Sequence, residues 1–246
     1  MTSYNDVLYE LQEYILNNEN IKKSIKTKIH CVKNEKSIVR ETLVPSKKPL
    51  LYIPNQQDTL FWCFYIIKHG DIKYETMNNK NVLVAKQIKI DLVTSIRQNK
   101  DIVKMHKFDT IINLESNLAN DNNLNPKTFL TLCAIENINI IYVSKKTYYE
   151  LFVNDSNIVY IVHELPSQSK YYNKYGFEIA CGDSLNNIKT TYYQISNVDK
   201  PIKSTSAYKV QDLILICSKL GIEITNTDTG KNKNKNDLYE SIVQYF

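Results

Sequence analysis

The sequence predicts an α+β domain with a mainly antiparallel sheet over residues 1–202, followed by a small helix–loop–helix module over residues 203–246. Three observations lead to this prediction. Apolar residues recur at helical spacing in several segments of the larger domain, and three strand-like runs follow those segments. The composition then changes in residues 186–206, which include Pro201 and several Ser and Thr, so the boundary is placed near residue 203.

Helices are expected where apolar residues return every three or four positions. The expected helices cover residues 4–17, 59–69, 82–98, part of 107–119, and 127–137. Asp58 or Thr59 can cap the second of them, and Gly70 can end it. Pro126 suits the start of the last one, because a proline in the first turn needs no amide partner.

Three runs of residues form the expected sheet. Residues 138–144 and 158–165 are continuous apolar runs, as in buried strands, and residues 174–180 alternate between apolar and polar. Turn-forming residues separate the runs, so their spacing predicts consecutive antiparallel hairpins without helical crossovers. A further short strand is expected at residues 50–54, and residues 25–45 are expected to form two short strands or one strand and an irregular arm.

Composition limits the class of protein. The 246 residues are 43% hydrophobic with a formal net charge of +5, so a core of ordinary size can form and the mild basicity alone does not imply nucleic acid. No signal peptide or membrane span is recognisable, which predicts an intracellular protein without membrane partners. The 5 cysteines are odd in number, far apart and without a CxxC pair. We therefore expect a reducing compartment, no disulfide framework, no metal site and no cofactor.

The last forty or so residues have a pattern of their own. A predicted helix after Ser206 ends at Leu220-Gly221-Ile222, a polar loop contains Gly230, and a second predicted helix begins near Lys235. Apolar residues of both segments share one face. These are Tyr208, Leu213, Ile216, Cys217, Leu220, Leu238, Ile242 and Tyr245.

This pattern resembles the SAP family of DNA-binding modules over about residues 203–246. The resemblance implies phosphate contacts from the lysines of the loop and of the second helix, supported by two lysines of the first helix. The loop lysines are Lys231, Lys233 and Lys235, and the supporting ones are Lys209 and Lys219. Such contacts hold nucleic acid without reading its sequence, and DNA is favoured over RNA. Two alternatives stay open: a helical hairpin that binds a protein, and one that caps the larger domain.

Cys63 differs from the other cysteines in its surroundings. It directly follows Trp62 near the start of a predicted helix, and Gln57 lies upstream. Aligned peptide dipoles at a helix N-terminus favour a thiolate, and a side-chain amide can help to bind an oxyanion. The alternative is a cysteine buried in an aromatic core.

The segment from Gln57 to Cys63 resembles the nucleophile region of papain-like cysteine peptidases, and the aspartate shortly before the cysteine is similar to the OTU branch. The resemblance implies a papain-like or OTU-like fold with Cys63 as nucleophile and Gln57 as oxyanion donor. It also implies His163, on a late strand, as base, with Glu178 or Asp183 as the acid that orients it. The alternative for His163 is a strand-end histidine with a structural partner.

Three functions remain open from the sequence. The first is a nucleic-acid-associated protein whose peptidase-like domain is inactive or weakly active. The composition of this chain is similar to that of proteins from large DNA viruses with AT-rich genomes. This similarity implies a location in the host cytoplasm or in the virion. The second is an active cysteine peptidase that acts on a ubiquitin-like protein or a peptide. The third is a scaffold role among virion proteins.

Overall fold

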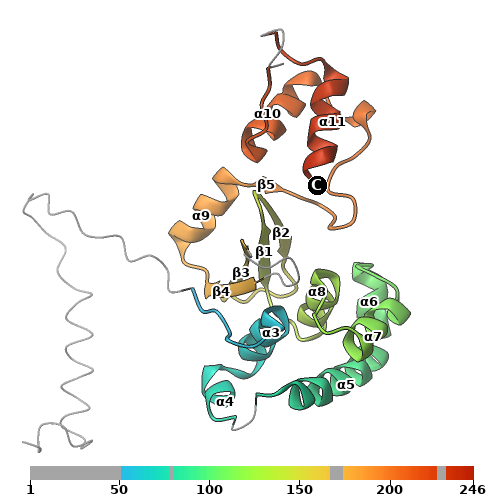
Figure 1. Ribbon diagram of the computed structural model, residues 1–246, viewed down its shortest axis with the longest axis vertical. Helices are drawn as coiled ribbons and strands as arrows, with labels where there is room; N and C mark the ends of the chain where they lie inside the picture. The colour runs from blue at the N-terminus through green and yellow to red at the C-terminus, as the bar shows by residue number, and fades with distance from the viewer. Residues whose placement is uncertain (1–50, 78–79, 167–173, 226–230) are drawn as a thin grey trace, which may run out of the picture. The chain divides into compact units, whose positions relative to one another are not determined.

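The computed structural model describes residues 51–246, except for residues 78–79, 167–173 and 226–230 (Figure 1). The predictions of a helix at residues 4–17 and of strands within residues 25–45 therefore lie outside the described residues. The described part of the chain is a mixed α+β structure, which confirms the α+β part of the predicted fold class.

Helices account for most of the regular structure. They are α3 (Thr59–His69), α4 (Asp71–Glu75), α5 (Val82–Gln98), α6 (Lys100–His106), α7 (Ile111–Asn120), α8 (Pro126–Ile135), α9 (Gly182–Thr191), α10 (Val210–Leu220) and α11 (Lys235–Tyr245). The predictions for α3, α5, α8 and the two C-terminal helices are confirmed, and that for residues 107–119 is confirmed in part by α7. Helices α4, α6 and α9 were not predicted.

The strands form one mixed sheet. They are β1 (Ile140–Ser144), β2 (Thr147–Leu151), β3 (Tyr160–Leu165), β4 (Lys174–Ile179) and β5 (Tyr193–Gln194), in the order β4-β3-β1-β2-β5. Pairs β1–β2 and β3–β4 are antiparallel, whereas β1–β3 and β2–β5 are parallel. The strand predicted at residues 50–54 is reduced to a single bridge between Tyr52 and Phe177.

The prediction of a mainly antiparallel sheet built from consecutive hairpins is wrong at its centre. Strand β2 was not predicted, and it takes the antiparallel place beside β1 after a tight turn in which Lys145 has φ of 50°. The chain then passes to the other edge of β1, where β3 runs parallel to it. The sequence does not indicate this turn, because two lysines, rather than Gly or Asn, connect the strands.

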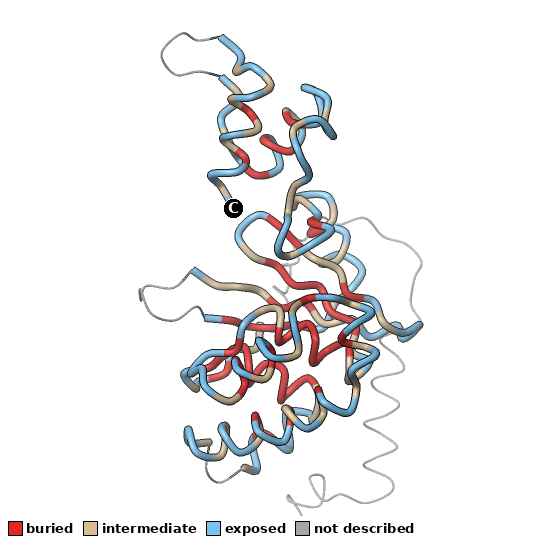
Figure 2. Tube along the Cα trace, turned by 90° about the vertical axis from the view of Figure 1, so that its right-hand side faces the viewer, coloured by how far each residue is buried: buried red, intermediate tan, exposed pale blue. Residues whose placement is uncertain are grey.

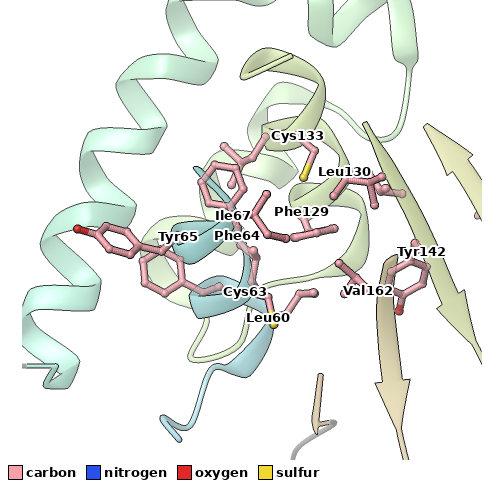
Figure 3. Close-up of a cluster of buried hydrophobic side chains, with 14 of the residues drawn as sticks. Leu60, Cys63, Phe64, Tyr65, Ile67, Phe129, Leu130, Cys133, Tyr142 and Val162 are labelled. Atoms are coloured by element: carbon pink, nitrogen blue, oxygen red, sulfur yellow. The ribbon is translucent and has the colours of Figure 1, made fainter. Parts of the chain in front are cut away.

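The two faces of the sheet belong to different hydrophobic clusters. Tyr142 and Val162 pack with α3 and α8, whereas Ile141 and Ile161 pack with Ile188 of α9 on the opposite face. This division follows from the strand geometry, since successive side chains point to opposite sides. Figure 3 shows Phe64, Phe129 and Val162 meeting in the first cluster.

Helix α3 is the centre of the larger cluster. Its residues Thr59 to Ile67 are all buried, as expected for a helix that is apolar on every side. Trp62 makes edge-to-face contacts with Phe61, Tyr65 and Tyr74. Such aromatic pairs contribute about 0.5–1.5 kcal/mol each beyond the area that they bury. The segment Phe61 to Phe64, which is unusually bulky for a site that must admit substrate, is therefore core.

Helices α10 and α11 have a core of their own (Figure 2). It consists of Leu213, Ile216, Cys217, Leu220, Leu238 and Ile242, with Ile222 and Ile224 packed against it. Gly221, with φ of 73°, ends α10 in the left-handed conformation, and the amide of Ile222 donates to the carbonyl of Cys217. The apolar face predicted for this module is confirmed.

None of the helices in the described part of the chain is long and apolar enough to span a membrane.

Candidate functional site

The thiol of Cys63 lies inside the main hydrophobic cluster (Figure 3). The residue is 0% exposed, and burial raises the pKa of its thiol far above the ordinary range, with a smaller contribution from the charge of Asp58. Cys63 is in the second turn of α3, beyond the first turn where the helix dipole acts most strongly. Desolvation therefore dominates over the dipole, and the thiol stays protonated.

His163 lies on the other side of the sheet. Val162 faces the cluster that contains Cys63, so its neighbour His163 faces the α9 side, together with Ile161. There the Nε2 atom of His163 lies 3.0 Å from Oε1 of Glu178, whose side chain is 7% exposed. The sheet separates the predicted nucleophile from the predicted base.

The other two members of the predicted catalytic set do not join them. Gln57 is exposed in the loop before α3, and the cavities beside it, of about 110 and 350 Å³, are lined by neither Cys63 nor His163. Asp183 is exposed in the first turn of α9, and Glu178 takes the place beside the histidine. The predicted combination of Cys63, His163, Gln57 and Asp183 is therefore not assembled. The structural alternatives, a core cysteine and a strand histidine with a carboxylate partner, describe what the structure contains.

Asp58, next to Gln57, has a structural role. Its Oδ1 accepts from the amide of Phe61 at 3.2 Å and so caps α3. Its Oδ2 lies 2.6 Å from Nζ of Lys89 and accepts from the amide of Leu124 at 3.0 Å. Both side chains of the ion pair are buried, with 9% and 6% exposure. This carboxylate therefore joins α3, α5 and the loop before α8.

Cys181 is the exposed cysteine among those described, and no role was predicted for it from the sequence. It caps α9, where its sulfur lies 3.4 Å from Oγ of Ser184. Hydrogen bonds from the side chain and the backbone of Ser184 lower the pKa of this thiol. Two signals could have identified it: a serine three residues later, as in helix caps, and the helical spacing of Leu185 and Ile188.

The lysines that are predicted to contact phosphate lie at or near the ends of the two helices of the C-terminal module. Lys231 is exposed, and Lys235 is the first residue of α11, whose N-cap Asn234 accepts from the next amides. Lys209 and Lys219, at the two ends of α10, are exposed. Among the described residues, none of these four lysines forms an ion pair with a carboxylate.

Lys233 is partly buried, as Lys235 is, and it also bonds within the module. Its Nζ donates to Oγ of Ser241 at 3.1 Å, and its amide donates to the carbonyl of Ile224. A bridge between Thr225 and Asn232 holds the two sides of the loop together at this point. Lys233 therefore contributes to the packing of the module as well as to its charge.

The helix N-terminus adds to the local positive field. The helix dipole places partial positive charge at the start of α11, and Lys231 and Lys235 lie on either side of the Asn234 cap. Asp237, in the first turn, reduces this field without pairing with either lysine. The arrangement offers cationic side chains, in the positive field of a helix N-terminus, to an anion at one end of the module.

Comparisons of the chain with protein-family models, with curated proteins and with solved structures found no match.

Proposed function

We propose that the module of residues 203–246 binds nucleic acid by contacting its phosphates, with Lys231 and Lys235 as the main contacts. The observation that supports this most is the combination of a separate two-helix core with lysines at one end that form no ion pair among the described residues. Lys233, Lys209 and Lys219 supply further charge. The resemblance to SAP modules supports DNA as the first nucleic acid to test.

The chemistry of such an interface predicts weak and salt-sensitive binding. Lysine contacts release counterions from the phosphates, so the logarithm of the binding constant falls with the logarithm of salt concentration by about 0.9 for each contact. Three contacts give a slope of about −3. Phosphate contacts carry no information on base sequence, so duplexes of different sequence should bind with similar affinity.

Fluorescence anisotropy with a labelled duplex of mixed sequence, measured from low to physiological salt, tests the proposal. The variant Lys231→Gln/Lys235→Gln should lower the affinity and reduce the slope by about 2, one unit for each contact removed. Lys100→Gln/Lys104→Gln, which changes two exposed lysines of α6, is the matched control and should bind as the parent does. Lys233→Gln is measured separately with a melting curve, because its ammonium also bonds to Ser241.

Salt-independent binding, or an equal loss in the α6 control, would contradict the proposal. An oligoribonucleotide of the same sequence, tested in parallel, decides between DNA and RNA.

A further inference from the structure

The turn between β1 and β2 has an unusual conformation for its sequence. It consists of Lys145 and Lys146, called the turn lysines below, and Lys145 has φ of 50°. Residues with a Cβ seldom adopt this left-handed conformation, which Gly or Asn adopts at a lower cost. Such a cost persists where the surrounding structure enforces the conformation, often because the residue has a use there. The side chains of the turn lysines therefore need an explanation.

Lys145 contacts the last residue of helix α11. Its Nζ donates to the carbonyl of Tyr245 at 3.1 Å and lies 5.3 Å from the centre of the Tyr245 ring. The backbone amide of Lys146 donates to the Tyr245 hydroxyl, also at 3.1 Å. Three contacts thus join this tyrosine to the turn.

Lys146 contacts the end of the other helix of the module. Gly221 ends α10 in the left-handed conformation, and a Cβ at this position would collide with the ammonium of Lys146. The carboxyl ends of α10 and α11 therefore meet at one turn of the larger domain. The partial negative charge at helix carboxyl ends favours ammonium groups there. Among the described residues, neither turn lysine forms an ion pair with a carboxylate.

Strand β5 makes a second connection beside the same turn. The amide of Tyr193 donates to the carbonyl of Lys146 at 3.0 Å, and the side chain of Tyr193 packs against the core of α10 and α11. The preceding Tyr192 packs instead against the cluster that contains Ile141 and Ile161 of the sheet. Adjacent residues thus belong to the core of the larger domain and to the core of the module.

The segment between β5 and α10 is bonded to both parts. On the side of the larger domain, Asp199 forms an ion pair with Lys127 in the first turn of α8. On the side of the module, the amide of Lys203 donates to the hydroxyl of Tyr208 at 3.0 Å, and its carbonyl accepts from the hydroxyl of Tyr239 at 2.9 Å. These bonds restrict rotation of the module in addition to the contacts of the turn.

We propose that the turn lysines fix the orientation of the module relative to the larger domain, so that the two move as one rigid body. Domains of one chain that share a small polar interface usually move relative to each other, so rigidity here would come from the contacts just described.

The consequence for nucleic acid rests on the proposed function. With a fixed module, a nucleic acid held at Lys231 and Lys235 has a fixed direction relative to the larger domain. Lys235 and Tyr245 are the two ends of α11, so the phosphate contact at Lys235 lies about 15 Å from the turn at a rise of 1.5 Å per residue.

Nuclear spin relaxation of the backbone amides tests the fixed orientation in the full chain without nucleic acid. Amides of α11 and of α8 should give the same rotational correlation time. The variant Lys145→Gly/Lys146→Ala removes both side chains, and glycine suits the left-handed position. In this variant the correlation time of the α11 amides should shorten about 2-fold relative to that of the α8 amides, because the module then moves independently.

Lys104→Ala/Lys107→Gly is the matched control. Lys107 is another exposed lysine in the left-handed conformation, with φ of 52°, and Lys104 is an exposed lysine of the same helix end. This control changes two lysines of the larger domain in the same way and should leave the two correlation times equal.

A distance measurement keeps the inference testable if the turn variant fails to fold. Spin labels at the exposed Cys181 and at Glu240→Cys of α11, in a Cys31→Ser background, should give one narrow distance distribution. A shorter correlation time for α11 in the parent or a broad distance distribution would overturn the inference. It would also be overturned by a folded turn variant that behaves as the parent does, or by an equal change in the α6 control.

Duplex binding separates this inference from the proposed function. The turn lysines are engaged with the helix ends, so Lys145→Gly/Lys146→Ala should keep the affinity within about 2-fold and the salt slope unchanged. A reduced slope would mean that the turn lysines contact phosphate, which would overturn the role proposed for them. Salt-dependent binding by a freely moving module overturns the fixed orientation and leaves the proposed function standing. A rigid module that binds no nucleic acid overturns the proposed function and leaves the fixed orientation standing.

Discussion

Replacing Lys89 with methionine should destabilise the larger domain strongly. Its ammonium is buried and lies 2.6 Å from Asp58, which caps the central helix α3. Methionine keeps most of the aliphatic length of lysine but leaves the carboxylate buried without a cation.

The size of the effect follows from the surroundings of Asp58. Removing one partner of a buried ion pair typically costs about 3–5 kcal/mol, because the remaining charge is uncompensated. Here the carboxylate keeps two amide donors, from Phe61 and Leu124, so we expect the lower end, about 3 kcal/mol. For a domain of this size the melting temperature should fall by about 6–12 °C.

The fluorescence of Trp62 is a suitable assay. It is the single tryptophan of the chain, it is 2% exposed, and it lies in the helix that Asp58 caps. Unfolding in urea therefore reports on the domain that contains the ion pair. Lys86→Met, an exposed lysine on the same helix as Lys89, is the control and should change the free energy of unfolding by less than about 0.5 kcal/mol.

A double-mutant cycle separates the pair from its other contacts. Asp58→Asn and Lys89→Met together should cost less than the sum of the two single changes, because the double variant leaves no buried charge unpaired. A Lys89→Met protein that melts within about 2 °C of the parent, or additive effects in the cycle, would refute the reasoning.

Two further outcomes follow from the structure. In a Cys31→Ser background, maleimide labelling of the native protein should modify Cys181 and leave Cys63 unmodified. Labelling at Cys63 in the folded protein would contradict the burial of that thiol. Because Ser184 lowers the pKa of the Cys181 thiol, Ser184→Ala should move the midpoint of Cys181 labelling to higher pH, and an unchanged midpoint would contradict this effect of Ser184. Burial lowers the pKa of His106 below its ordinary 6.5, so the unfolded chain binds the proton more readily and stability falls as pH drops below about 6.5. The loss of melting temperature between pH 7.5 and 5.5 should be smaller in His106→Gln, and an unchanged loss would argue against a contribution from this histidine.

Local sequence determined most of the helices. The apolar spacing, the caps at Asp58 and Asn125 and the glycine at position 221 act within a few residues of one another. The sequence alone therefore predicts α3, α5, α8 and the C-terminal helix pair. It also predicts the core of that pair, because residues three and four apart on a helix share one face.

The tertiary structure decided the strand order and the site. Whether β3 pairs parallel or antiparallel with β1 depends on which edge of β1 is already taken, and β2 occupies one edge after a turn without the usual turn residues. The same sheet separates Cys63 from His163. Cys63 belongs to the cluster that packs on one face, and the side chain of His163 is on the other face, although the order of the two residues along the chain suits a peptidase. The β1–β2 turn and the end of α11, which are far apart in sequence, meet through the hydrogen bonds from Lys145 and Lys146 to Tyr245. Contacts between distant segments depend on the packing of the whole domain, and a local pattern of residues does not contain that information.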